Sequence, residues 1–269
     1  MIDCHMHIHW FGHGPTKAVK HMDTLGVERS WLLGWQSIKT GREVARNTMT
    51  NRRTANAHKK FPDRFIPFCS VDPLSKDPEK QMRTWAELGF RGLGEQKVRL
   101  RIDNPDSVAL YHLAGELGWP VLFHIDIWNP NATFWYNHDV SALEAVLQEC
   151  AEVKFVGHGP GFWREISGDA DSAPPGYPSG KVTAGGRLVK LLEKYPNLYC
   201  DLSARSGLNA LSRDPKFGLR FLTKYHRRIL YGTDMFTSEH IEYLRSLDLP
   251  AKTFRAITRE NALRLVPVG

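Results

Sequence analysis

Residues 1–7 read Met-Ile-Asp-Cys-His-Met-His, a short stretch in which two histidines are separated by a single residue. In an extended strand, alternate side chains point to the same face, so we expect His5 and His7 to project together. Two neutral imidazoles side by side are suited to a transition-metal ion such as Zn²⁺. Short His-x-His pairs are common, so the meaning of this pair depends on what the rest of the chain brings to the same place.

Seven further apolar segments follow, and helical patterns alternate with them. The expected strands are 1–7, 30–34, 65–71, 91–98, 120–125, 153–157, 198–202 and 229–233. The expected helices are 16–25, 42–60, 77–88, 106–117, 138–150, 182–195, 214–225, 238–247 and 258–265. Alternation of this kind predicts parallel strands, and eight units predict a single α/β domain over residues 1–269, a (β/α)₈ TIM barrel. The proline-containing segment 159–180 is predicted to be a long loop that acts as a lid or pocket wall.

The composition is that of an ordinary globular protein. Of the 269 residues, 42% are hydrophobic and 24% are charged. No apolar run approaches the roughly 18–20 residues of a membrane span, so we expect no membrane partner. We also expect no signal peptide. The four cysteines show no Cys-x-x-Cys spacing, which indicates reduced thiols in a cytoplasmic protein.

The chain is basic, with a formal charge of +7 and a pI of about 9.2. A basic protein can bind nucleic acid. Here the charge is spread along the chain, with one denser stretch within 42–60, which favours the solvated face of an outer helix. We therefore expect a small-molecule substrate rather than nucleic acid. The sequence leaves a homo-oligomer open.

Polar residues recur at the C-terminal ends of the expected strands, which share one rim of a barrel where active sites lie. These residues are His5, His7, Glu95, His124, His158 and Asp234. Each has an ordinary alternative: a histidine can be a hydrogen-bonded loop residue, Asp234 can cap a helix, and Glu95 can pair with Lys97 or Arg99. Taken together, four histidines and two carboxylates at one rim predict a divalent-metal site.

Several stretches resemble the amidohydrolase superfamily, of the type called amidohydrolase-related or amidohydrolase 2. The matching stretches are Ile2–His7, Phe123–His124, Val156–Gly161, Leu198–Ala204, Ile229–Asp234 and the C-terminal Ile257–Leu265. The resemblance runs from end to end, and the combination is specific although no single piece is. It implies a (β/α)₈ barrel that holds one or two divalent metal ions, usually zinc.

The resemblance also implies roles for individual residues. His5, His7 and Asp234 would bind one metal, and His124 would be a further ligand. His158 would bind a second metal or orient the reacting water. Glu95 follows Gly-x-Gly, as in relatives that carry a bridging glutamate on strand four. In an extended strand Lys97 would point to the same side as Glu95. A carboxylated Lys97 is therefore the alternative residue that could bridge two metal ions.

These features predict hydrolysis of an amide, lactone or ester bond in a small, cyclic or carboxylated substrate. A metal brings the pKa of its bound water from about 15.7 toward about 7. Asp234 would act as the general base, and His158 would hydrogen-bond the nucleophile. The alternatives are a metal-dependent decarboxylase of an aromatic acid, a TatD-like nuclease, and a barrel that binds a ligand without catalysis.

Aromatic and basic residues in the expected rim loops are candidates for contact with the substrate. Trp128 and Trp163 would line the pocket, and Arg164 would hold a carboxylate through its two-pronged guanidinium. Further candidates are Trp10, Phe11, Trp135, Tyr136, Phe162 and Arg205. Asp201 is interpreted as a polar rim residue or a helix cap.

Overall fold

The computed structural model describes residues 1–9, 12–35, 49–127, 136–172 and 177–267. All of its strand pairs are parallel, and they form two ladders, β1-β2-β3 and β4-β5-β6-β7-β8. The strands are β1 (Ile2–Met6), β2 (Arg29–Leu33), β3 (Phe65–Phe68), β4 (Leu93–Gln96), β5 (Val121–His124), β6 (Phe155–His158), β7 (Leu198–Asp201) and β8 (Ile229–Leu230). They follow the predicted order, and most are shorter than predicted.

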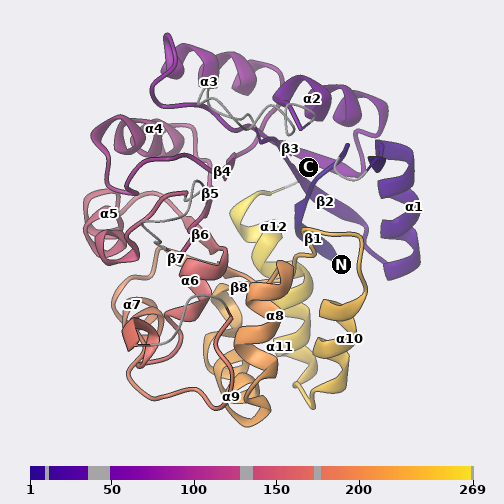
Figure 1. Cartoon of the computed structure of the whole chain (residues 1–269). Helices are drawn as coiled ribbons and strands as arrows, with labels where there is room; N and C mark the ends of the chain where they lie inside the picture. The colour runs from indigo at the N-terminus through magenta and orange to yellow at the C-terminus, as the bar shows by residue number, and fades with distance from the viewer. Residues whose placement is uncertain (10–11, 36–48, 128–135, 173–176, 268–269) are drawn as a thin grey trace.

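Backbone contacts cross both seams between the two ladders. Cys69 and Leu93 form an isolated parallel bridge between the end of β3 and β4. At the other seam, the amide of Cys4 donates to the carbonyl of Tyr231 at 2.9 Å, which joins β1 to the end of β8. The strands therefore lie in the order of a (β/α)₈ barrel, as predicted, with regular pairing interrupted at two places (Figure 1).

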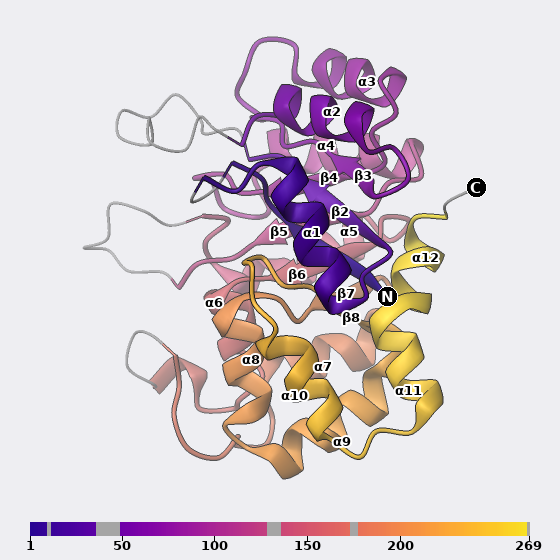
Figure 2. The ribbon, with the colours of Figure 1, turned by 90° about the vertical axis from the view of Figure 1, so that its right-hand side faces the viewer.

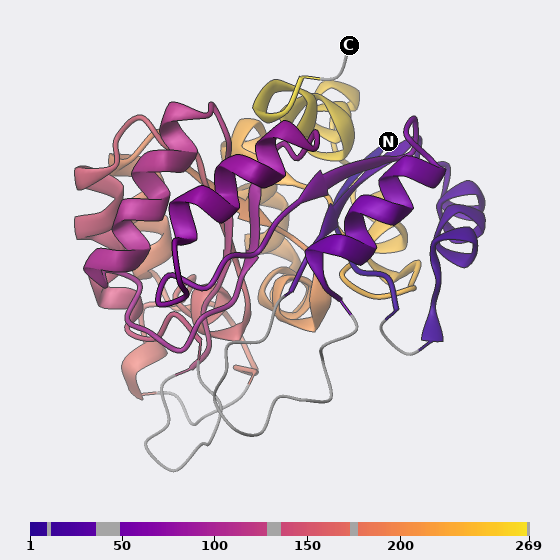
Figure 3. The ribbon, with the colours of Figure 1, turned by 90° about the horizontal axis from the view of Figure 1, so that it is seen from above.

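The helices lie around the outside of the strands (Figures 2 and 3). They are α1 (Pro15–Leu25), α2 (Asn51–Lys60), α3 (Pro78–Glu87), α4 (Pro105–Glu116), α5 (Leu143–Glu149), α6 (Pro160–Arg164), α7 (Arg187–Lys194), α8 (Ala204–Ser212), α9 (Pro215–Tyr225), α10 (Glu239–Ser246), α11 (Ala251–Arg255) and α12 (Asn261–Leu265). Several begin on proline, whose fixed φ and missing N–H suit the first helical turn. A π-helical segment, Ala256–Glu260, joins α11 to α12.

Two clusters of buried apolar side chains hold the strands and the surrounding helices together. The larger cluster packs strand side chains against the outer helices. The smaller one unites residues from both ladders, such as Trp31 of β2 and Leu122 of β5, with Leu265 of α12. Trp31 stacks on Phe68 with ring centroids 4.7 Å apart. This second cluster fills the space between the strands, and α12 packs against it next to β1.

The prediction of one continuous loop over 159–180 is wrong. Pro160–Arg164 forms the short helix α6, and Ala170–Ser172 forms a 3₁₀ turn, while residues 173–176 lie outside the described part. Gly159 precedes α6 with a φ of 96°, a conformation that favours glycine, and Pro160 then starts the helix. Helices this short carry too little apolar periodicity to be seen in a sequence.

Other helix boundaries also differ from the prediction. The expected helix 42–60 begins only at Asn51, because Thr50 is extended and its side chain accepts the amide of Arg53 as an N-cap. Residues 36–48 lie outside the described part. The expected helix 182–195 begins at Arg187, since Gly185 has a φ of 90°. Helix α8 was not predicted. Among the described helices, none is both long and apolar enough to cross a membrane.

Candidate metal centre

His5 of β1 and His7, which follows directly after β1, face the same space, as expected from their spacing. Their Nε2 atoms lie 3.1 Å apart. The other nitrogen of each ring is engaged elsewhere: Nδ1 of His5 lies 2.7 Å from Oδ2 of Asp201, and Nδ1 of His7 lies 3.0 Å from the carbonyl oxygen of Leu33. Both acceptors favour a proton on Nδ1, which leaves the Nε2 lone pairs directed at the shared space.

Asp234 reaches the same space from the end of β8. Its backbone N–H donates to the carbonyl of His5 at 2.7 Å, and its φ is 60°. Its Oδ1 atom lies 3.3 Å from Nε2 of His5 and 3.5 Å from Nε2 of His7. Burial alone would raise the pKa of Asp234, but the neighbouring imidazoles bring it down to about 2. The carboxylate is therefore ionised at neutral pH.

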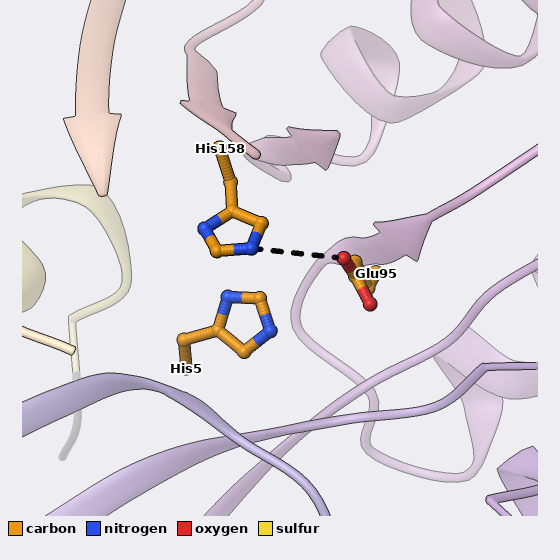
Figure 4. A group of neighbouring side chains, drawn as sticks. All are labelled: His5, Glu95 and His158. Atoms are coloured by element: carbon orange, nitrogen blue, oxygen red, sulfur yellow. Dashed lines mark ion pairs between the residues drawn. The ribbon is translucent and has the colours of Figure 1, made fainter. Parts of the chain in front are cut away.

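Glu95 and His158 complete the group from β4 and β6 (Figure 4). Glu95 Oε2 lies 3.3 Å from Nε2 of His7, and its Oε1 lies 4.0 Å from Nε2 of His158. Both side chains are buried. Burial lowers the pKa of His158, and the positive charge of His5 lowers it further, so His158 is neutral at pH 7. A neutral imidazole has the lone pair that a metal needs.

These residues form two overlapping groups whose donor atoms lie within 4.8 Å of one another: His5, His7 and Asp234, and His5, Glu95 and His158. His5 belongs to both groups. Because Nδ1 of His5 is held by Asp201, only Nε2 is available as a ligand. One nitrogen lone pair serves one ion, so the donor set fits a single divalent cation with imidazole and carboxylate ligands, a mixture suited to Zn²⁺ or a similar metal.

His124 lies beside this centre, and neither of its ring nitrogens joins the two groups. Nδ1 lies 2.8 Å from Oε1 of Glu95, and Nε2 lies 2.8 Å from Oδ1 of Asp126. Burial would lower the pKa of His124, but the two carboxylates raise it overall. The structure thus brings His5, His7, Glu95, His158 and Asp234 together and holds His124 between two carboxylates.

Lys97 reaches the edge of the centre without joining it. Its Nζ lies 3.8 Å from Oε1 of Glu95 and 4.1 Å from the ring centroid of Trp35. The ring centroid of Tyr136 lies 5.2 Å from the same Nζ atom. Aromatic faces stabilise a charged ammonium group, so this position suits a cation better than a carboxylated lysine.

Two buried aspartates contact His5, and neither contact was predicted from the sequence. Asp201, read as a rim residue or a helix cap, contacts the ring of His5. Asp3 accepts the backbone N–H of His5 at 2.9 Å and the hydroxyl of Thr233 at 2.7 Å. Asp201 is the last residue of β7, so the rule that selected the other strand-end residues could also have selected it.

The predicted substrate-binding residues have different positions. Trp128 lies outside the described residues, as do Trp10, Phe11 and Trp135. Trp163 is buried, and its indole N–H donates to the backbone carbonyl of Asp201 at 2.9 Å, so it packs behind the end of β7. Arg164 donates to the carbonyl of Ala170 and lines a cavity of about 410 Å³, whose lining also includes Asp126.

The sequence matches the family described as Amidohydrolase over residues 2–268. A comparison with curated proteins found no match. The matched range contains every residue of the candidate metal centre.

Three solved structures illustrate which folds the chain resembles. An uncharacterized TIM-barrel protein from Bordetella bronchiseptica has 17% identity and a TM-score of 0.72, covering 99% of this chain and 98% of that one. A probable 2-pyrone-4,6-dicarboxylic acid hydrolase from Acinetobacter baumannii with citric acid bound has 14% identity and a TM-score of 0.63, covering 98% of both chains. A dihydroxybenzoic acid decarboxylase from Polaromonas with bound manganese and 2-nitroresorcinol has 18% identity and a TM-score of 0.58, covering 93% and 84%. At these identities the likeness concerns the fold.

Proposed function

The chain belongs to the amidohydrolase family, and from this premise we propose that it is a metal-dependent hydrolase of an amide, lactone or ester bond in a small molecule. Members of the family are enzymes that depend on a metal ion. For this chain, we propose the identity of the metal, the residues that bind it and the reaction that it supports.

One divalent ion, with Zn²⁺ as the first choice, would be held by His5, His7, Asp234, Glu95 and His158. The donor chemistry fits, because three imidazoles and two carboxylates offer atoms within 4.8 Å of one another in each group. When bound, such a metal supplies a Lewis acid and lowers the pKa of a coordinated water toward about 7. An ion in this position would also offset the charge of Glu95 and Asp234.

The observation that carries the proposal is the position of Asp234. Its side chain is 12% exposed, whereas His5 and His7 are at most 1% exposed, so among these three it is the one that water can reach. Its carboxylate is ionised and can accept a proton on an oxygen atom. We assign it the role of general base, which takes a proton from the attacking water and returns it to the leaving group.

His158 and His124 have supporting roles in this proposal. His158 is neutral, so the lone pair on its Nε2 would be available to the same ion. His124 is held between Glu95 and Asp126, so its orientation is fixed by both carboxylates. It remains a candidate further ligand if the contact with Asp126 is released.

The substrate would enter by the cavity that Asp126 and Arg164 line, because Asp126 contacts His124 beside the candidate metal centre. Arg164 lines this cavity, and we assign it the contact with a substrate carboxylate, to which a guanidinium can bind with two parallel hydrogen bonds. This agrees with a small carboxylated substrate.

The test is turnover by zinc-loaded protein against a panel of lactones, amides and esters with and without a carboxylate. Hydrolysis that is lost after chelation and restored by zinc would support the proposal. Carbon dioxide release from hydroxybenzoates, with no hydrolysis of any panel member, would replace it with the decarboxylase. That second candidate is favoured by the solved decarboxylase with the same fold.

A further inference from the structure

Asp201 is the last residue of β7, and its carboxylate is completely buried next to the candidate metal centre. Its Oδ2 atom lies 2.7 Å from Nδ1 of His5 and 3.1 Å from Nδ1 of His158. The two rings come from β1 and β6, and their centroids are 4.4 Å apart. A single carboxylate therefore contacts the outer nitrogens of two rings whose Nε2 atoms face the centre.

The other contacts of this carboxylate fix its orientation. Oδ1 accepts the backbone N–H of Ser203 at 2.8 Å and the thiol of Cys4 at 3.4 Å. The Ser203 hydroxyl donates to Oδ2 at 2.8 Å and lies 3.0 Å from Nδ1 of His158. Because the hydroxyl hydrogen is used on Asp201, the Ser203 oxygen is free to accept a proton from His158. All these contacts agree with one arrangement, in which both rings carry their proton on Nδ1.

We propose that Asp201 is a positioning residue that fixes the tautomer and orientation of His5 and His158 together, so that both rings offer Nε2 to one divalent metal. The inference rests on the proposed function in that it assumes a metal at this centre. An ionised carboxylate only accepts hydrogen bonds, so the facing ring nitrogens must be the protonated ones. Carboxylates that orient metal-ligating histidines in this way raise metal affinity.

Replacement of Asp201 by asparagine tests the proposed tautomers most directly. The backbone N–H of Ser203 can only donate, so the amide oxygen of asparagine is expected on the Oδ1 side. The amide NH₂ group then faces His5, and it needs a lone pair on Nδ1. His5 would have to move its proton to Nε2, where the proton blocks the metal. The variant keeps the size of the side chain and reverses the tautomer.

The experiment measures zinc affinity by competition with a chromophoric chelator at pH 7, on metal-free wild type, Asp201→Asn and Asp3→Asn. Asp3 is the matched control, because it is also a completely buried aspartate and contacts the backbone of His5 but no ring nitrogen. We expect the apparent Kd of Asp201→Asn to rise about 10- to 100-fold, with Asp3→Asn close to wild type. Equal affinity of the two variants would overturn the proposal.

A second measurement keeps the test independent of whether Asp201→Asn folds. The ¹⁵N chemical shifts of the imidazole nitrogens in metal-free wild type, recorded above the pH at which His5 loses its second proton, report which nitrogen of His5 and of His158 carries the one remaining proton. Protons on Nδ1 of both rings support the proposal, and a proton on Nε2 of His5 overturns it. This readout needs neither metal nor turnover. If the wild type took up no zinc, the proposed function would fail, while the tautomers would still decide the role of Asp201.

Discussion

Oδ1 of Asp234 lies 3.3 Å from Nε2 of His5, so the end of the last strand meets the end of the first. The contact is supported by the backbone, since the amide of Asp234 donates to the carbonyl of His5. The contact between these two strand ends therefore brings the members of the centre together. A metal ligand and a proton acceptor are brought together by the same contact.

Asp234→Asn should abolish most of the proposed activity. The amide cannot accept the water proton, and loss of a general base costs about 10²- to 10⁴-fold in rate. The measurement is kcat/KM at saturating zinc on the best substrate of the hydrolysis panel. Asp248→Asn, the same change at an exposed position, should leave kcat/KM unchanged. A loss of less than tenfold in Asp234→Asn would remove Asp234 from the role of base.

Elemental analysis of zinc-loaded protein should give close to one metal ion per chain. The reason is that His5 has a single available nitrogen and belongs to both donor groups. His5→Ala should lose nearly all metal, because both groups lose a member. Glu95→Ala should keep one ion at lower affinity, since His5, His7 and Asp234 remain. Two ions per chain, falling to one in Glu95→Ala, would instead indicate a bridging glutamate.

Arg164→Met should weaken the binding of carboxylated substrates. A hydrogen-bonded charge pair contributes roughly 1.5–3 kcal/mol, which corresponds to a KM about 10- to 100-fold higher with little change in kcat. Substrates without a carboxylate should be unaffected, and comparison of an acid with its methyl ester measures this. Arg83→Met serves as the control, because Arg83 is an exposed residue paired with Glu116. An equal KM increase for acid and ester would exclude the carboxylate contact.

Asp3→Ala should destabilise the fold, while Asp3→Asn should be close to neutral. Alanine leaves the buried amides of His5 and Thr233 without an acceptor, at a cost of roughly 1–3 kcal/mol for each unpaired group. Asparagine retains an oxygen for both amides. Chemical denaturation of the metal-free proteins at pH 7 measures the difference. Similar free energies of unfolding for the two variants would show that the hydrogen bonds of Asp3 matter little.

Glu28 should make a modest, pH-dependent contribution to stability. Hydrogen bonds from Arg259 bring its pKa from 4.5 down to about 2, with the N-terminal ammonium as a second partner. Because the folded-state pKa is lowered, the stabilisation is present above pH 4.5 and is lost as the pH falls toward 2. The residue is partly exposed, so we expect at most about 1 kcal/mol at pH 7.

The Tm of wild type minus that of Glu28→Gln, followed from pH 7 to pH 2, measures this contribution. The difference should be positive at pH 7 and vanish near pH 2. A difference that is constant over this range would mean that the effect of Glu28 does not depend on its charge.

Hydrophobic strands separated by helical segments were sufficient to predict the barrel, because parallel strands follow from the alternation itself. The strand-end residues that form the centre also followed from this pattern. The positions at which two helices begin, Asn51 and Arg187, were not predicted from the sequence, because they depend on a local cap at Thr50 and on the φ of Gly185.

By itself, the sequence determined the order of the strands and which polar side chains lie at their ends. Only the tertiary structure decided what each of those side chains faces. The carboxylates of Glu95 and Asp126 hold His124 away from both donor groups, and Asp201 orients two rings from distant strands. Such contacts join strands that are far apart in the chain. A pattern along one strand gives the face of a side chain but not its hydrogen-bond partner, since that partner is set by how the strands pack around the barrel.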